Sequence, residues 1–286
     1  MKTYNSFSSW QIYVVEIKQE LSKLESVVSP FVAQIRMAFF KFERLCLFAS
    51  FAGKEQLFWN ASERGRFSED RIKFYIAEIL CGMKACHDAG LICRLTPEKI
   101  LLDARGHVVL SSFGLLTIAS KPRYGEFSRH SIATDLWSLG FIMLEMGVEW
   151  KFSSSYTSSM KERFFDAGEV SQTQMNDTFE MIRFMPYDLS PAGRSFLQGL
   201  LNPNPQYQLG VDNGAYDLMV HPWFNGIDWE EYNQGQAAPP YQPQLSTSPR
   251  SLIVNEVVDL VATSRELNPW NFLAEDLANP LRNTEG

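Results

Sequence analysis

The chain has 286 residues, of which 45% are hydrophobic and 21% are charged, a composition typical of a soluble globular protein with a substantial core. Its formal net charge is −7, and acidic and basic residues are interspersed, which disfavours a surface that follows nucleic-acid phosphates. The polar N-terminus and the lack of any run of roughly 18 apolar residues predict neither a signal peptide nor a membrane span.

The first predicted element is a helix over residues 10–28, in which apolar residues recur about every 3.6 positions. They are Tyr13, Ile17, Leu21, Leu24 and Val28. We expect Ser29-Pro30 to end this helix, since the residue before proline disfavours helical geometry. Two strands are predicted next, at Phe31–Phe40 and Leu45–Phe51, with a polar turn between them.

A second, longer helix is predicted to begin after Ser68, which we expect to cap it. A hairpin follows, with strands Ile100–Leu102 and Val108–Leu110 joined by the turn sequence Asp103-Ala-Arg-Gly. Helical patterns then dominate, at Ala133–Met146, about Thr173–Phe184, and Pro191–Leu200. A few strands followed by many helices predict an α+β fold with a small sheet end and a larger helical end.

The cysteines show no spacing typical of a zinc site. They are Cys46, Cys81, Cys86 and Cys93, and His87 and His107 do not complete a zinc pattern. We therefore expect buried free thiols in a reducing compartment and no metal site. The segment from Gln234 to Arg250 is rich in Gln, Pro and Ser and is predicted to be an extended linker or strap.

Five segments in a fixed order carry a resemblance to a known family. They are SPFVAQIRMAF (29–39), RFSEDRIKFYIAEILCGMKACHDAGLICR (66–94), TDLWSLGFIMLEM (134–146), LSPAGRSFLQGLLNPNPQYQLG (189–210) and HPWFNGIDWEEYNQGQAAPPYQP (221–243). Together they resemble the AGC group of serine/threonine protein kinases over roughly residues 12–243. The resemblance implies a protein-kinase-like bilobal fold with a truncated small β lobe (1–52), a larger helical C-lobe (53–225) and an AGC-like C-terminal tail (226–286).

The catalytic loop departs from the family pattern H/Y-R-D-L-K-P-E-N. The chain reads Cys-Arg-Leu-Thr-Pro-Glu-Lys from Cys93, and the deleted position is the catalytic aspartate. Arg94 is kept, whereas Thr96 replaces the lysine and Lys99 the metal-binding asparagine. Ser112 replaces the aspartate of D-F-G. A general base contributes about 10²–10⁴-fold and Mg²⁺ neutralises phosphate charge, so no catalytic residue is intact and no metal site is expected.

Six positions are candidates for nucleotide contacts because they match family positions. They are Lys2 and Glu20 as an ion pair, Ala49 as gatekeeper, Phe51 in the hinge, and Leu57 and Leu101 below the adenine. The Gly-rich strands that cover ATP phosphates in the family precede the first of these positions and are not found in the sequence. We therefore expect no cofactor, with ATP binding weak or absent and Mg²⁺ unbound.

The family positions that this chain retains are mainly apolar. The resemblance places five residues in the family's structural spine and its anchor, namely Leu24, Ile35, Cys93, Phe113 and Asp135. From Ser112 to Asp135 the activation segment is short and has no A-P-E motif. Gln208 takes the place of the arginine that pairs with the glutamate of that motif.

These losses favour a pseudokinase that acts by protein binding or scaffolding, in the cytoplasm or the nucleus. The expected partners are other proteins, including a kinase or signalling protein, and neither nucleic acid nor a membrane span. Two alternatives stay open. One is a residually active ATP-dependent serine/threonine kinase that uses substitute residues, and the other is a truncated kinase fragment without function.

Overall fold

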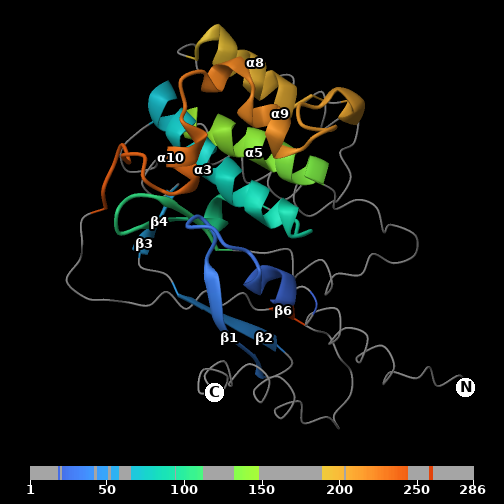
Figure 1. The fold of residues 1–286 in the computed structure, drawn as a ribbon, viewed down its shortest axis with the longest axis vertical. Coiled ribbons are helices and arrows are strands. Elements are labelled where there is room, and N and C mark those ends of the chain that lie inside the picture. The colour runs from blue at the N-terminus through green and yellow to red at the C-terminus, as the bar shows by residue number, and fades with distance from the viewer. Residues whose placement is uncertain are drawn as a thin grey trace, which may run out of the picture.

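This computed structural model describes residues 19, 21–41, 44–50, 53–57, 66–93, 95–111, 132–147, 189–202, 204–243 and 258–259. In Figure 1 the helices α3, α5, α8, α9 and α10 gather at one end of the molecule. The strands β1, β2 and β6 lie at the other end, and β3 and β4 lie between the two. The predicted α+β arrangement, with a small sheet end and a larger helical end, is confirmed.

The sheet at the far end has the strand order β1-β2-β6. The strands β1 (Gln34–Lys41) and β2 (Arg44–Ser50) pair antiparallel and confirm the two strands expected before the hinge. A short strand from the C-terminal segment, β6 (Val258–Asp259), pairs with the beginning of β2. No prediction was made for β6, because two residues carry too little pattern to identify a strand.

The helix before β1 ends earlier than predicted. Residues 21–25 are helical, and a turn begins at Ser26, whose hydroxyl donates to the carbonyl oxygen of Lys23. Leu21 and Leu24 are buried as expected, but Val28 is 90% exposed, so its place on the apolar face was predicted wrongly. A serine that hydrogen-bonds back to its own chain competes with the helix ladder and ends it. Residues 10–18 and 20 of this prediction lie outside the described residues.

A second sheet, β3-β4-β5, joins the two ends. It consists of β3 (Gly53–Gln56), β4 (Ile100–Asp103) and β5 (Val108–Leu110), and the predicted hairpin is confirmed. Asp103 builds the hairpin turn, because its carboxylate accepts from the backbone N–H groups of Arg105 at 2.8 Å and His107 at 2.9 Å. A 3₁₀ turn, η1 (Pro97–Lys99), leads into β4.

The long helix α3 (Glu69–Asp88) confirms the prediction for this segment, with one difference at its start. Ser68 occupies the N-cap position, but its side chain makes no capping hydrogen bond. Acidic Glu69 and Asp70 in the first turn instead stabilise the helix N-terminus, where the partial charge is positive. The predicted apolar face of α3 is buried, including Ile72, Tyr75, Ile76, Ile79, Leu80, Met83 and Cys86.

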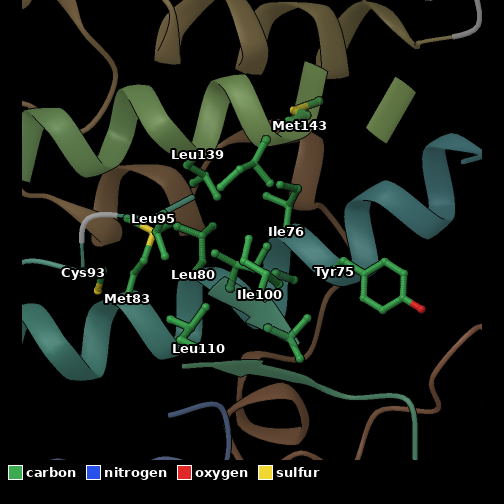
Figure 2. Packing of buried hydrophobic residues seen from close by; sticks show 14 of the residues in the cluster. Tyr75, Ile76, Leu80, Met83, Cys93, Leu95, Ile100, Leu110, Leu139 and Met143 are labelled. Carbon is green, nitrogen blue, oxygen red and sulfur yellow. The ribbon is translucent and has the colours of Figure 1, made fainter. Parts of the chain in front are cut away.

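The core lies where α3 packs between α5 (Ile132–Gly147) and the second sheet. Figure 2 shows Ile76 and Leu80 of α3 between Leu139 of α5 and Ile100 of β4. The helix α8 (Pro191–Leu200) packs on the far side of α5 and has the predicted bounds. The helix expected at about Thr173–Phe184 lies outside the described residues.

Short elements complete the helical end, and the chain then returns to the hairpin. They are η2 (Pro205–Tyr207), α9 (Ala215–Met219), η3 (Pro222–Phe224) and α10 (Trp229–Asn233). Beyond α10, a Cβ atom placed on Gly106 would lie 1.9 Å from the carbonyl oxygen of Tyr241, so the tail runs directly over the β4–β5 turn. Within the described residues, no helix has both the length and the apolarity to cross a membrane.

Candidate functional site

The loop between α3 and β4, which corresponds to the catalytic loop in the resemblance, begins at a buried carboxylate. Asp135, in the first turn of α5, is 0% exposed. Its Oδ2 atom accepts a 2.7 Å hydrogen bond from the backbone N–H of Cys93 and lies 2.8 Å from Nε2 of His87. The carboxylate thus joins the end of α3, the start of the loop and α5.

The other end of the loop is held by its own backbone. The carbonyl oxygen of Lys99 accepts from both the N–H and the hydroxyl of Ser111, each at 2.9 Å. The N–H of Lys99 in turn donates to the carbonyl oxygen of Thr96 at 3.0 Å. The side chains of Thr96 and Lys99 are half-buried. Arg94 and Ser112, the other degenerate catalytic positions, lie outside the described residues.

Three carboxylates near the loop in sequence take part in structural contacts. Asp88 pairs with Lys84 one helical turn away at 2.6 Å, and Asp103 builds the hairpin turn. Glu78 is completely buried and accepts from the backbone N–H of Val108, while its other oxygen lies 2.6 Å from Nδ1 of His107. Burial raises the pKa of Glu78, although these hydrogen bonds oppose the rise. None of the three occupies the loop itself.

The predicted nucleotide positions are only partly described. Leu57 and Leu101 are buried, at 0% and 5% exposure, and Leu101 pairs with Gln56 across β3 and β4. The fold therefore brings these two positions close together. Ala49 of β2 stands opposite Ile35 of β1, but their side chains are not described. Lys2, Glu20 and Phe51 lie outside the described residues.

The proposed spine is also partly described. Leu24 and Cys93 are buried, at 4% and 1% exposure, and Cys93 is tied to Asp135 through its backbone. Figure 2 shows Cys93 beside Met83 and Leu95. Phe113 lies outside the described residues, so the spine as a unit stays a prediction.

Sequence reasoning missed the side-chain group around Asp135. A ring nitrogen of His87, Sγ of Cys93 and a carboxylate oxygen of Asp135 all lie within 4.8 Å of one another. Cys81, Cys86 and Cys93 are free and buried, as predicted. A hydrogen bond with Cys86 and burial raise the pKa of the Cys93 thiol well above its ordinary value. Spacing rules did not find the group because Asp135 is distant in sequence and comes from another helix.

Gln208 connects two helices at the position where the family has an arginine paired with the glutamate of A-P-E. Its side chain is buried, and Nε2 donates to the carbonyl oxygens of Leu200 at 2.9 Å and Ala133 at 3.3 Å. The amide thus joins the end of α8 to the start of α5. A neutral donor satisfies these carbonyl groups without burying a charge.

Comparison with known proteins agrees with this geometry. The model of the protein kinase domain matches residues 2–224. The serine/threonine-protein kinase SCH9 of Saccharomyces cerevisiae is 34% identical over 234 residues, 76% of this chain and 27% of that protein. RAC-beta serine/threonine-protein kinase A of Xenopus laevis is 31% identical over 242 residues, 78% of this chain and 47% of that protein.

The probable serine/threonine-protein kinase DDB_G0277449 of Dictyostelium discoideum is 30% identical over 248 residues, 80% of this chain and 51% of that protein. The chain thus spans between about a quarter and about half of the length of these relatives. The similarity to SCH9 and RAC-beta supports the AGC group. The chain belongs to the protein kinase family and has its bilobal fold.

Proposed function

We propose that this chain is a pseudokinase, a kinase-fold protein that acts by binding other proteins rather than by transferring phosphate. The observation that carries the proposal is the state of the loop at Cys93–Lys99. Its backbone is held at both ends, by Asp135 and by Ser111. Yet the sequence contains no aspartate between Asp88 and Asp103. The loop thus keeps the hydrogen bonds that hold its backbone but lacks the aspartate that acts as general base in the family. This combination supports a structural role for the loop.

The chemistry of the remaining residues supports the same proposal. Transfer of a phosphoryl group needs a residue that positions the hydroxyl and ligands that hold Mg²⁺. At the ligand positions the chain has Lys99 and Ser112, and a cation or a hydroxyl is a poor ligand for this hard metal ion. Asp103 and Asp88 cannot take over the role of the missing catalytic or metal-binding residues without breaking contacts that they already make. Asp103 builds the hairpin turn, and Asp88 pairs with Lys84.

The relatives keep the first alternative open, because SCH9, RAC-beta and the Dictyostelium protein are serine/threonine kinases by name. An active chain would have to use substitute residues such as Lys2 and Glu20. The second alternative, a fragment without function, predicts poor folding. The continuous core around α3, α5 and α8, with Ile76, Leu139 and Phe196 all at 0% exposure, supports a folded domain instead.

The test of catalysis is a radiolabelled phosphate-transfer assay with the full chain, a generic protein substrate, and either Mg²⁺ or Mn²⁺. We expect no incorporation above the background without protein, while an active AGC-group kinase in the same assay gives a clear signal. Incorporation that disappears in the variants Lys2→Ala and Glu20→Ala would overturn the proposal and favour the residually active enzyme.

The test of binding uses cross-linking in cells, followed by reconstitution from two purified proteins. We expect a partner protein, of the kinase or signalling class, that binds the purified chain with unchanged affinity in Lys2→Ala. The buried thiols Cys81, Cys86 and Cys93 fit a reducing compartment, the cytoplasm or the nucleus, as the place for this experiment. A chain that unfolds without a cooperative transition would favour the fragment without function.

A further inference from the structure

We propose that His87, Cys93 and Asp135 form a binding site for one zinc-type divalent metal ion. The three residues come from the end of α3, from the loop after it and from the first turn of α5. One donor atom of each lies within 4.8 Å of the other two. This site is separate from the magnesium chemistry of phosphate transfer and does not depend on the proposed function.

The donor set selects the metal. A thiolate, an imidazole nitrogen and a carboxylate oxygen are the three ligand types that zinc uses in proteins. Magnesium and calcium prefer sites made only of oxygen atoms, and a thiolate favours a softer ion. The combination of Cys93, His87 and Asp135 therefore favours Zn²⁺, with Co²⁺ as its spectroscopic substitute.

The distances require a small movement. Nε2 of His87 and Oδ2 of Asp135 lie 2.8 Å apart, which is a hydrogen-bond distance. Two ligands on one tetrahedral zinc ion are separated by about 3.3 Å, given bonds of about 2.0–2.1 Å. The metal ion would thus replace the shared proton and push the two atoms apart by roughly half an ångström. This is within the range of a side-chain adjustment.

The protons balance in a simple way. Binding converts the Cys93 thiol to a thiolate and releases that proton to solvent, because a metal-bound thiol is deprotonated. The imidazole of His87 stays neutral, because the proton that Nε2 shares with Asp135 is exchanged for one on Nδ1, and the net release is the single proton of Cys93. No oxidant or reductant is involved.

Within the described part of the chain, His87 is also incompletely hydrogen-bonded. The side chain of His87 is only 7% exposed, and its Nδ1 atom is buried without a hydrogen-bond partner among the described residues. A buried imidazole that uses one nitrogen is incompletely satisfied, which costs stability. Because Nε2 is the proposed ligand atom, Nδ1 would carry the ring proton when the metal ion is bound, so the unfilled position marks a place for a further partner beside His87.

The surroundings offer a further donor and a route of entry. The thiol of Cys86 hydrogen-bonds with Cys93, so a residue of suitable chemistry for a fourth ligand adjoins the group. His87 also lines an open cavity of about 590 Å³, together with Lys84, Asp88 and the loop at 210–216. A hydrated ion can therefore approach the group from the surface at the end of α3.

The experiment uses the full chain, stripped with a chelator and titrated with Co²⁺ under anaerobic, reducing conditions. We expect one Co²⁺ per chain, a strong thiolate-to-cobalt absorption band in the near ultraviolet, and loss of that band when one equivalent of Zn²⁺ is added. Zinc should also raise the melting temperature. A wild-type chain that gives no such band and retains no zinc by elemental analysis overturns the proposal.

Variants locate the ion. Cys93→Ser and His87→Gln should each weaken Zn²⁺ binding by more than about tenfold, since even residues that only orient a ligand change affinity by about 10–100-fold. Cys81→Ser is the matched control, because Cys81, on α3, is also a buried free cysteine but lies outside the group. Each variant is first shown by circular dichroism to be folded. If Cys93→Ser does not fold, His87→Gln decides.

Two outcomes with folded variants contradict the site. Unchanged affinity in His87→Gln shows that the ion binds elsewhere. A cobalt band that is lost in Cys81→Ser but kept in Cys93→Ser assigns the thiolate to Cys81 and likewise overturns the proposal. Cys81 does not belong to the group of donor atoms that lie within 4.8 Å of one another, so its thiol is not expected to compete.

Discussion

The carboxylate of Asp135 accepts a 2.7 Å hydrogen bond from the backbone N–H of Cys93, across 42 residues of sequence. Both residues are almost completely buried, so this contact is shielded from water. A charged acceptor in such a place strengthens the hydrogen bond and makes its loss costly. The contact fixes where the loop leaves α3, whether or not the loop carries out chemistry.

Replacing this carboxylate should therefore destabilise the fold. Asp135→Asn keeps the shape but removes the charge, so the hydrogen bond from Cys93 and the contact with His87 lose their charged acceptor. We expect a loss of about 3 kcal/mol in the free energy of unfolding, measured with urea. The control is Asp88→Asn, whose exposed pair with Lys84 should contribute less than about 1 kcal/mol. Equal effects of the two changes would contradict the structural role of Asp135.

Among the described residues, local pattern predicted most of those that lie in helices and strands. The periodicity of α3 and the turn sequence at Asp103 each lie within a short window, and both elements formed where expected. Val28 was misplaced because the apolar period continued beyond the point where Ser26 hydrogen-bonds back to Lys23. Competition between a side chain and the helix backbone is not visible in a hydrophobic pattern.

Contacts within the candidate site were less predictable. The resemblance placed Asp135 near the loop, but nothing in the sequence indicated that His87 would lie 2.8 Å from it. Similarly, Glu69 accepts hydrogen bonds from Ser190 and from Trp223, 121 and 154 residues away. Such contacts depend on how helices pack, and packing is set by the whole chain rather than by a local motif.

The Gly106–Tyr241 contact gives a test of how the tail is attached. Gly106 has a φ of 98°, and a Cβ atom there would lie 1.9 Å from the carbonyl oxygen of Tyr241. Gly106→Ala should therefore both strain the turn and displace the tail, seen as lower stability and as faster proteolysis near residue 241. Gly90→Ala is the control, because Gly90 has a φ of 71° but no atom within 4 Å of the added Cβ.

We expect Gly90→Ala to cost only about 1 kcal/mol from backbone conformation, with no change in cleavage of the tail. Gly106→Ala should cost more than this. Identical proteolysis of the two variants would mean that the tail does not depend on its contact with the hairpin turn.

Glu69 predicts a pH dependence of stability. Burial raises the pKa of its carboxyl, but hydrogen bonds from Ser190 and Trp223 outweigh burial and lower the pKa below its ordinary value of 4.5. A group with a lowered pKa in the folded state stabilises the fold above its ordinary pKa, and this contribution is lost as pH falls through the folded value. Stability should thus fall below about pH 4.5 more steeply in the wild type than in Glu69→Gln.

At pH 7 the Glu69→Gln variant should lose about 1–2 kcal/mol, because a neutral acceptor replaces a charged one in a half-buried site. Asp70→Asn is the matched control, since Asp70 lies in the same helical turn and is exposed. Urea unfolding at several pH values measures both. Parallel pH profiles for Glu69→Gln and the wild type would contradict the role of this carboxylate.

Nucleotide binding is tested by thermal unfolding with ATP. Leu57 and Leu101, the positions expected below the adenine, are already buried within the chain, and the metal-ligand positions hold Lys99 and Ser112. We expect millimolar ATP to change the melting temperature by less than about 1 °C, with or without Mg²⁺, because weak binding contributes little stabilisation. A shift of several degrees that does not depend on Mg²⁺ would contradict this prediction.

Gln208 tests whether loss of the family's charged pair at this position matters for stability. Its amide lies buried and donates to Leu200 and Ala133, so Gln208→Arg would place a charge where a neutral donor now sits. We expect a loss of about 3 kcal/mol in urea unfolding, since a buried charge without a charged partner is strongly unfavourable.

The control for added charge is Gln206→Arg, because Gln206 is exposed on the neighbouring 3₁₀ turn. That change should alter stability by no more than about 0.5 kcal/mol. Equal stability of Gln208→Arg and Gln206→Arg would contradict this prediction. It would mean that the arginine at position 208 finds a carboxylate partner, as the corresponding arginine does in the family. A large loss for Gln208→Arg alone would show that this part of the helical end is now built around neutral hydrogen bonds.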